Sequence, residues 1–208
     1  MFKYCLKNIR VIVKQLAIAS FFSIIITSGV LLIIGNKINL YINLLDKMTV
    51  EVIKKENENI HLDTTKKRLI NYPLYDTIFA TVKIPSIKVE APLYHGDSLD
   101  ILKKGIGHYP GSYFPGEGAS VILAAHNSKE HFMYLPKLKK GAKVIIDTIY
   151  GTFTYEVYNY KIIKDTDVAS LPVQTDKEIL MMYTCYPVAT IGHKSKRYVV
   201  YAKLVGGN

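Results

Sequence analysis

The sequence predicts a mainly β domain, a closed or nearly closed barrel of about 130 residues, preceded by an N-terminal transmembrane helix. Three observations lead to this prediction. From about Asp76 onward, short apolar runs alternate with turn residues, and few stretches show helical periodicity. Ahead of this region, nineteen residues from Leu16 to Ile34 carry no charge and are rich in Ile, Leu, Val and Phe.

Length and composition limit the possible protein classes. A chain of 208 residues has room for one ordinary domain and an appendage, but not for two full domains. Charged residues make up 21% and aromatic residues 11%, which excludes a disordered or collagen-like chain. Two cysteines are too few for a disulfide-dense scaffold or a four-cysteine zinc site.

The uncharged run is interpreted as an uncleaved signal anchor. As a helix it would span roughly 28 Å, close to the thickness of the hydrocarbon core of a bilayer. A cleaved signal peptide has a shorter apolar region and an Ala-x-Ala-like site, whereas this run ends in Gly35-Asn36-Lys37. The residues before it include no acid and four cations, which are Lys3, Lys7, Arg10 and Lys14. Residues 1–15 are therefore predicted to be cytoplasmic, 16–34 to span the membrane, and the remainder to lie outside.

The net charge of +10 divides between these parts of the chain. Residues 76–208 contain 16 basic and 12 acidic residues, the balance of an ordinary solvated surface, so no nucleic-acid partner is expected. Residues 35–75 begin with a loose apolar stripe and turn strongly polar, which we interpret as a solvated stalk or linker. The catalytic domain is therefore predicted to be 76–208.

The barrel is predicted from its strands. The candidates are Ile78–Ile84, Ile87–Leu93, Val121–Ala125, Lys143–Tyr150, Thr152–Ile163, Ile179–Thr184 and Tyr198–Val205. Gly151 separates two long β-rich runs and predicts a hairpin. One short helix is predicted over Leu99–Lys104, capped by Ser98 and ended by Gly105, and residues 131–138 are a candidate helical turn.

Cys185 is the candidate nucleophile. It is the sole thiol of the predicted exported region, because Cys5 precedes the membrane run. The alternative is a small buried apolar residue. However, an unpaired thiol in an oxidising compartment is exposed to oxidation, so its presence favours a function. Cys185 also ends the apolar run Ile-Leu-Met-Met-Tyr-Thr, and Pro187 interrupts strand pairing two residues later.

His126 and Arg197 are the candidate partners of this cysteine. His126 ends the apolar run Val-Ile-Leu-Ala-Ala and is the best candidate base, whereas His193 is predicted to be exposed in a loop. Their spacings from cysteine do not match a zinc ligand pattern. The chain uses 24 lysines and three arginines, and Arg197 is the single arginine of the predicted catalytic domain. Its planar donor fork suits an oxyanion, although a structural salt bridge is the alternative.

Residues 76–205 resemble a sortase, a membrane-anchored cysteine transpeptidase of Gram-positive bacteria. The matching segments occur in the family's order: KIPSIKVEAPLYHG (83–96), LKKGIGHYPGSYFPGEGASVILAAH (102–126), FMYLPKLKKG (132–141), TCYP (184–187) and RYVVYA (197–202). The resemblance implies a closed eight-stranded barrel with short helices. It also implies a catalytic triad of Cys185, His126 and Arg197.

Local motifs point to one class within the family. TCYP and the Pro-Gly-Glu-Gly stretch look most like class D sortases. Asn71-Tyr72-Pro73 does not match the Asp-Pro-aromatic lid of class C, and the short segment Lys164–Lys177 differs from the long helix of class B. Many relatives read Gly-His-Arg where this chain reads Ala125-His126-Asn127, which leaves the histidine in place but alters its surroundings.

The resemblance also implies an activity. Cys185 would attack the Thr carbonyl of an LPxTG-like sorting signal in a surface protein, and the resulting thioester would pass to an amine of peptidoglycan or, alternatively, to a pilin lysine. His126 would be the general acid and base, and Arg197 would hold the oxyanion. No metal or organic cofactor is required, and calcium, which some sortases bind, is left open. The enzyme would be a single-pass protein of the cell membrane with an extracellular catalytic domain.

Three other functions fit the sequence less well than a sortase. A papain-like or NlpC-type hydrolase places its cysteine at a helix start and its histidine later, the reverse of the order here. An L,D-transpeptidase carries a Ser-His-Gly-type motif that this sequence lacks. A non-enzymatic membrane-anchored binding module would not need Cys185, and its function would survive Cys185→Ala.

Overall fold

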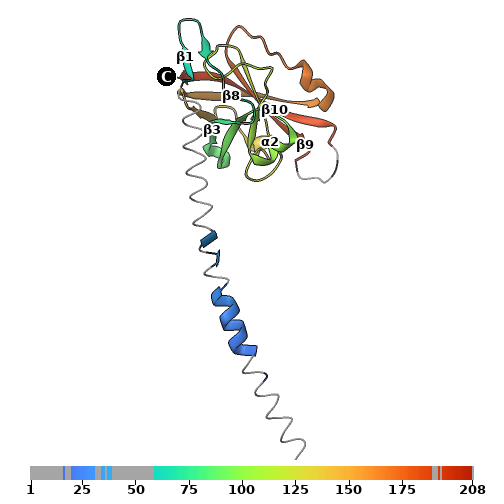
Figure 1. Cartoon of the computed structure of the whole chain (residues 1–208). Helices are drawn as coiled ribbons and strands as arrows, with labels where there is room; N and C mark the ends of the chain where they lie inside the picture. Colours follow the sequence, from blue (N-terminus) through green and yellow to red (C-terminus); the bar gives the residue numbers. More distant parts are fainter. Residues whose placement is uncertain are drawn as a thin grey trace, which may run out of the picture. The chain divides into compact units, whose positions relative to one another are not determined.

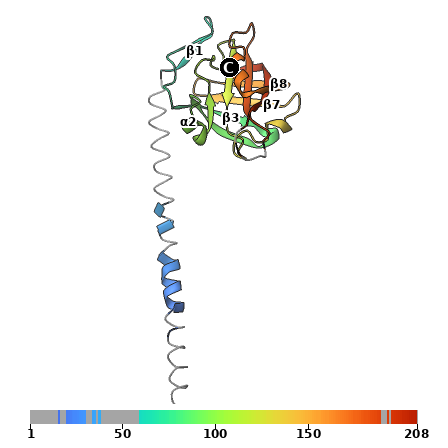
Figure 2. The same ribbon diagram turned by 90° about the vertical axis from the view of Figure 1, so that its right-hand side faces the viewer.

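The computed structural model describes residues 16, 20–30, 34–35, 37–38, 59–188, 192 and 194–207. The chain forms two compact units, Met1–Val52 and Ile53–Asn208 (Figures 1 and 2). The predictions that fall on residues 1–15, on His193 and on residues 39–58 lie outside the described part of the chain.

The amino-terminal unit is helical over residues 20–30. The Thr27 hydroxyl bonds back to the carbonyls of Ser23 and Ile24, at 2.9 and 3.0 Å, so this polar side chain is satisfied within the helix. Among the described residues, no helix has both the length and the apolar character needed to cross a bilayer. Several residues of the predicted 16–34 span lie outside the described set, and the membrane anchor stays a prediction.

The second unit is a closed eight-stranded barrel, as predicted, with strand order β10-β8-β7-β3-β4-β5-β6-β9. Most neighbours are antiparallel, whereas β4–β5 and β6–β9 are parallel. Figure 1 shows the long strands β8 and β10 side by side. The barrel strands are β3 (Ile78–Ile84), β4 (Val89–His95), β5 (Ile106–His108), β6 (Ser120–Ala124), β7 (Lys143–Thr148), β8 (Gly151–Lys164), β9 (Ile179–Tyr186) and β10 (Lys196–Gly207).

Most strand predictions agree with the structure to within about two residues. The hairpin predicted at Gly151 joins β7 to β8. Helix α2 (Leu99–Lys104) has the predicted bounds and the predicted cap, because Ser98 Oγ accepts a hydrogen bond from Ile101 N. The helical turn predicted over 131–138 is represented by the 3-10 helix η2 (Leu135–Lys137), and two more such helices are η1 (Pro85–Ile87) and η3 (Asp165–Ser170).

The strands bury side chains on both faces. Residues inside the barrel, among them Val82, Leu180 and Val200, form the main hydrophobic core. A smaller cluster lies on the outer face of the sheet, where Met181 and Val199 are fully buried beside Val168 and Leu171 of the β8–β9 connection. This connection therefore covers one part of the outer face.

Part of the segment predicted as a solvated stalk is instead folded. Residues 61–70 form a hairpin of β1 (His61–Asp63) and β2 (Arg68–Ile70), in which Leu69 is 1% exposed. The buried carboxylate of Glu117 accepts hydrogen bonds from Leu69 N at 3.0 Å and from the Tyr72 hydroxyl at 2.9 Å. These contacts come from residues distant in sequence, so the polar composition of this segment gave no indication of them.

The Pro-Gly-Glu-Gly turn that supplies Glu117 is itself fixed by a second buried acid. Glu178 accepts hydrogen bonds from Gly116 N, Gly118 N and the Tyr155 hydroxyl, at 2.5–3.1 Å. Gly116 has φ +93°, and a Cβ there would lie 2.6 Å from Leu62 Cδ2. The turn thus needs glycine for its backbone and the two glutamates for its hydrogen bonds.

Candidate active site

Three neighbouring strands bring the predicted catalytic residues together. The parallel pair β6–β9 sets Ala124 beside Tyr183. His126 and Cys185 each follow this pair by two residues, and side-chain alternation directs both to the outer face. On the other side of Cys185, Arg197 of β10 is its direct cross-strand partner. Neighbouring strands lie about 4.8 Å apart, so the histidine, cysteine and arginine occupy one row.

The three side chains share a cavity of about 290 Å³. Its walls come from α2, from the ends of β6 and β9, from η3 and from the start of β10. They comprise Leu99, Leu102, Ala124, Ala125, His126, Asp165, Val168, Tyr183, Thr184, Cys185 and Arg197. Cys185 is unpaired and half-buried. The cavity thus places a thiol, an imidazole and a guanidinium against a partly apolar wall.

Side-chain hydrogen bonds fix the strand ends that carry His126 and Cys185. The buried Thr184 hydroxyl donates to Ala125 O at 2.9 Å, which joins the residue before the cysteine to the residue before the histidine. The Asn127 amide nitrogen donates to Val188 O at 2.8 Å, which joins the residues that follow them. The departure from the Gly-His-Arg sequence therefore provides a structural link, which the sequence alone did not predict.

Arg197 is oriented by its own loop. Its Nη1 donates to the carbonyls of Lys194 and Lys196, at 2.7 and 2.9 Å. Both bonds use Nη1, and a guanidinium has further N–H donors on Nε and Nη2. These bonds position the side chain at the cavity, where the further donors are suited to a carbonyl oxygen or an oxyanion.

Tyr183 is a cavity residue that sequence analysis missed. Burial raises the pKa of Tyr183 to about 12, and the negative charge of Asp97 adds to the shift. Burial also raises the pKa of Asp97. The tyrosine is therefore a neutral phenol at physiological pH, a hydrogen-bonding group rather than a charge. Its position two residues before Cys185 on the same face could have indicated that it lines the site.

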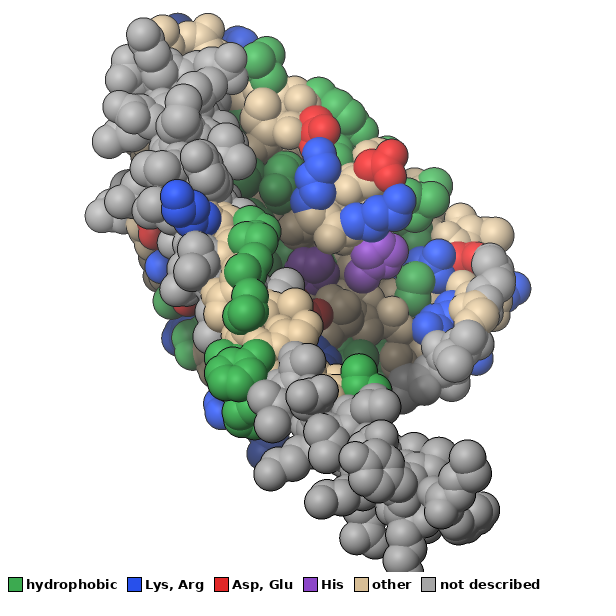
Figure 3. Space-filling model, turned by 60° about the horizontal axis from the view of Figure 1, so that its bottom comes forward, with side chains coloured by type: hydrophobic (Ala, Val, Ile, Leu, Met, Phe, Trp, Pro, Cys, Tyr) green, Lys and Arg blue, Asp and Glu red, His purple; other side chains and the backbone are tan. Residues whose placement is uncertain are grey.

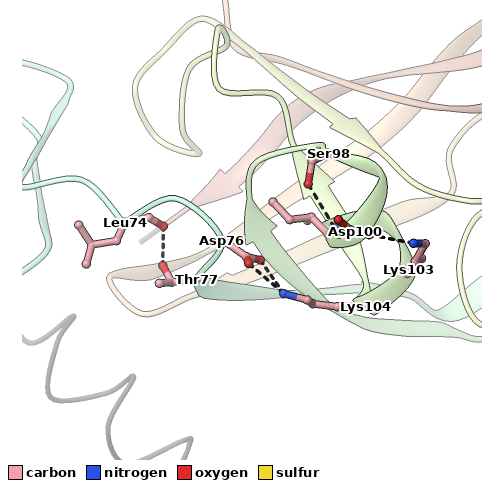
Figure 4. Close-up of polar contacts among 8 residues, drawn as sticks. Leu74, Asp76, Thr77, Ser98, Asp100, Lys103 and Lys104 are labelled. Carbon is pink, nitrogen blue, oxygen red and sulfur yellow. Dashed lines mark hydrogen bonds and ion pairs between the residues drawn. The ribbon is translucent and has the colours of Figure 1, made fainter.

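Helix α2 forms the opposite wall and is held in place at both ends. Figure 4 shows the Ser98 cap at its start, and the Lys104 ammonium bound to both carboxylate oxygens of Asp76, at 2.9 and 3.0 Å. The Asp100–Lys103 pair within the helix has a separation of 2.8 Å. These contacts hold Leu99 and Leu102 over the cavity.

Comparison with known proteins identifies the family. The model of the Sortase domain matches residues 82–205, which include all three cavity residues named above. The chain belongs to the sortase family. Within the described residues no cluster of His, Cys, Asp and Glu side chains could hold a metal ion.

Individual relatives come from several groups of sortases, among them A, C, D and E. Sortase D of Bacillus subtilis (strain 168) is 38% identical over 124 residues, which span 60% of this chain and 62% of that protein, so the match covers less than two thirds of this relative. A Clostridium perfringens Sortase D5 transpeptidase superposes with a TM-score of 0.59 at 26% identity, over 75% of this chain and 88% of that one. Sortase C2 of Group B Streptococcus Pilus Island 1 has a TM-score of 0.58 at 25% identity, over 77% and 97%.

Proposed function

We propose that this chain is a class D sortase, a cysteine transpeptidase that cleaves an LPxTG-like sorting signal between Thr and the next residue. The observation that carries this proposal is the row of His126, Cys185 and Arg197 at the ends of three adjacent strands, open to one cavity. The match to Sortase D supports the class.

The first step is acylation of Cys185. Its Sγ attacks the carbonyl carbon of Thr, and a tetrahedral intermediate forms whose oxyanion accepts hydrogen bonds from Arg197. The C–N bond then breaks, and His126 gives a proton to the departing amine. The product is a thioester between Cys185 and the carboxyl-terminal Thr of the cleaved surface protein.

The second step transfers the acyl group to an amine. We assign a peptidoglycan amine as the acceptor, with a pilin lysine as the alternative, which the similarity to a sortase of a pilus island favours. His126 removes a proton from the attacking amine, and Cys185 leaves as the thiolate. The triad is then ready for another sorting signal.

The proposed location is the cell membrane. The uncharged run from Leu16 to Ile34 and the four cations before it support a single span with the amino terminus in the cytoplasm. The barrel would then lie outside the cell, where surface proteins and peptidoglycan amines are both available.

Intact-mass spectrometry tests the reaction. The full-length chain in detergent micelles is incubated with a panel of LPxTG-like peptides and quenched with acid. We expect one adduct whose mass corresponds to the peptide up to Thr. Cys185→Ala should lose the adduct, whereas the matched control Cys5→Ala should keep it. The absence of an adduct with every peptide, or its persistence in Cys185→Ala, would refute the proposal.

A further inference from the structure

A second and larger cavity, of about 740 Å³, opens beside the one that contains Cys185. Its walls come from β4, from the end of α2, and from the loop that follows β6. They comprise Glu90, Ala91, Pro92, Lys103, Lys104, His126, Asn127, Ser128, Glu130 and His131. His126 lines both cavities, so the imidazole is accessible from two sides. Figure 3 shows a hollowed face with histidine side chains in its wall and lysine and acidic side chains near its rim.

Helix α2 stands between the two cavities. Its apolar residues Leu99 and Leu102 line the cavity of Cys185, whereas Lys103 and Lys104 at its carboxyl end line the second cavity. The two spaces therefore differ in chemistry: the first has an apolar wall suited to side chains of an extended peptide, whereas eight of the ten residues around the second are polar or charged.

The loop that connects His126 to Glu130 is tightly constrained. Phe132 is fully buried, and its N–H donates to His126 O at 3.0 Å. Within the loop, Ser128 O accepts from His131 N and Met133 N, at 3.2 and 3.1 Å. Ser128 Oγ also lies 3.0 Å from His131 Nδ1. Glu130 thus extends from a fixed backbone at the cavity that His126 also lines.

Glu130 differs from the other charged residues of this cavity, because the opposite charges that act on it are those of its chain neighbours His131 and Lys129. Lys104 is paired with Asp76, Lys103 with Asp100, and Glu90 with Lys83. By contrast, within the described part of the chain Glu130 forms no ion pair with a lysine or arginine. A backbone hydrogen bond and the Ser128 side chain lower the pKa of Glu130, so it is ionised at neutral pH.

We infer that the second cavity binds the amine acceptor, and that Glu130 binds its ammonium group. This inference rests on the proposed function and assigns the second substrate of the same site. The ligand chemistry is a primary ammonium at the end of a peptide or of a side chain. The position of His126 between the cavities carries the inference, because one imidazole must protonate the departing amine from one substrate and deprotonate the arriving amine of the other.

The transfer step is balanced as follows. The bound ammonium gives one proton to solvent and becomes a free amine, whose nitrogen attacks the thioester carbonyl carbon. A C–N bond forms, the C–S bond breaks, and the electron pair of that bond returns to Cys185 as the thiolate. The second proton of the attacking nitrogen passes to neutral His126, which becomes the imidazolium.

Substitution of Glu130 tests the inference in the full-length chain in detergent, with a donor peptide that forms the adduct. The acceptors are triglycine amide, Nα-acetyl-lysine amide and hydroxylamine, a small nucleophile that is uncharged at neutral pH. We expect the KM for the two ammonium acceptors to rise about threefold to fivefold in Glu130→Gln and about tenfold in Glu130→Lys. Acyl-enzyme formation, in which the acceptor takes no part, is the internal reference, and the surface variant Glu156→Gln is the matched control.

The outcomes separate the two proposals. Unchanged KM values in Glu130→Lys overturn the acceptor site, while adduct formation still supports the transpeptidase. An equal loss of transfer to hydroxylamine also overturns it, because His126 would then have been displaced. A selective effect on triglycine amide identifies a peptide amino terminus as the acceptor, and one on Nα-acetyl-lysine amide identifies a side-chain amine. Without an acyl-enzyme in the unmodified chain, the proposed function itself fails.

Discussion

The two faces of the β9–β10 ribbon have different functions near Cys185: one lines the cavity and the other packs in the barrel core. Cys185 and Arg197 point outward into the cavity, whereas their neighbours Thr184 and Tyr198 point inward and are 1% and 6% exposed. On each strand, a residue that faces the cavity is therefore followed or preceded directly by a residue that packs in the core. We therefore expect substitutions of the cavity residues Cys185 and Arg197 to change activity at constant stability, and substitutions of their inward-pointing neighbours to change stability more than activity.

Arg197→Lys is expected to have the largest effect on this comparison. The charge remains, but the planar donor fork is lost, so kcat/KM for transpeptidation should fall about 100-fold, as when an oxyanion donor is removed. The midpoint of thermal unfolding should stay within about 2 °C, because the side chain lies on the outer face. Near-normal turnover would contradict the proposed oxyanion role.

Glu178→Gln changes the buried acid that directly precedes β9, at the end of the strand opposite to Cys185. The amide presents an NH₂ group toward three donors that now bind a carboxylate, from Gly116, Gly118 and Tyr155. We expect the free energy of unfolding to fall by about 2–3 kcal/mol, measured by urea denaturation. The activity of the folded fraction should be unchanged. An equal loss in the surface variant Glu156→Gln would show that burial is not the cause.

His108 extends the comparison to the interior of the barrel. Burial lowers the pKa of His108 to about 4, below the value of about 6.5 in the unfolded chain. Between these values the unfolded state binds more protons, so stability falls as the pH falls through this window. From pH 6.5 to 5 the loss from this group should be about 1.6 kcal/mol.

Urea denaturation of two variants at several pH values measures this dependence. His108→Leu should flatten the slope of unfolding free energy against pH, whereas the exposed histidine variant His61→Asn should not. A slope that persists in His108→Leu would assign the acid sensitivity to other groups.

Thr184→Val has the smallest expected effect. Thr184 points into the core, but its hydroxyl binds the residue before the proposed catalytic His126, so the substitution should affect both stability and activity. It removes the hydrogen bond to Ala125 O with little change in volume, so unfolding should become easier by about 1 kcal/mol. Because Ala125 precedes His126, a modest loss of kcat is expected as well, which conservative Thr184→Ser should restore. A loss of kcat above 50-fold (about 2.3 kcal/mol) would mean that the hydroxyl acts in the chemistry.

The alternation of apolar and polar residues made the long strands β8 and β10 predictable from sequence. A capping serine and a terminal glycine did the same for α2. The three-residue strand β5 was missed, because it contains Gly107 and is too short to show a period. Hairpin β1–β2 was missed because its stability depends on Glu117, 48 residues from Leu69.

The site also has features that local sequence predicts and features that depend on long-range contacts. Cys185, His126 and Arg197 were predicted from residue type at strand ends and from the family resemblance. The cavity walls and the second cavity depend on where α2 rests, which involves the long-range contact of Lys104 with Asp76.

The attachment of the hairpin at Glu117 has a mechanical consequence. The turn that carries Glu117 is bound by Glu178 at the start of β9, whereas Cys185 is near its end, roughly 23 Å away at about 3.3 Å per residue. Tension arriving from the amino-terminal side is therefore taken up first by the hydrogen bonds of Leu69 and Tyr72.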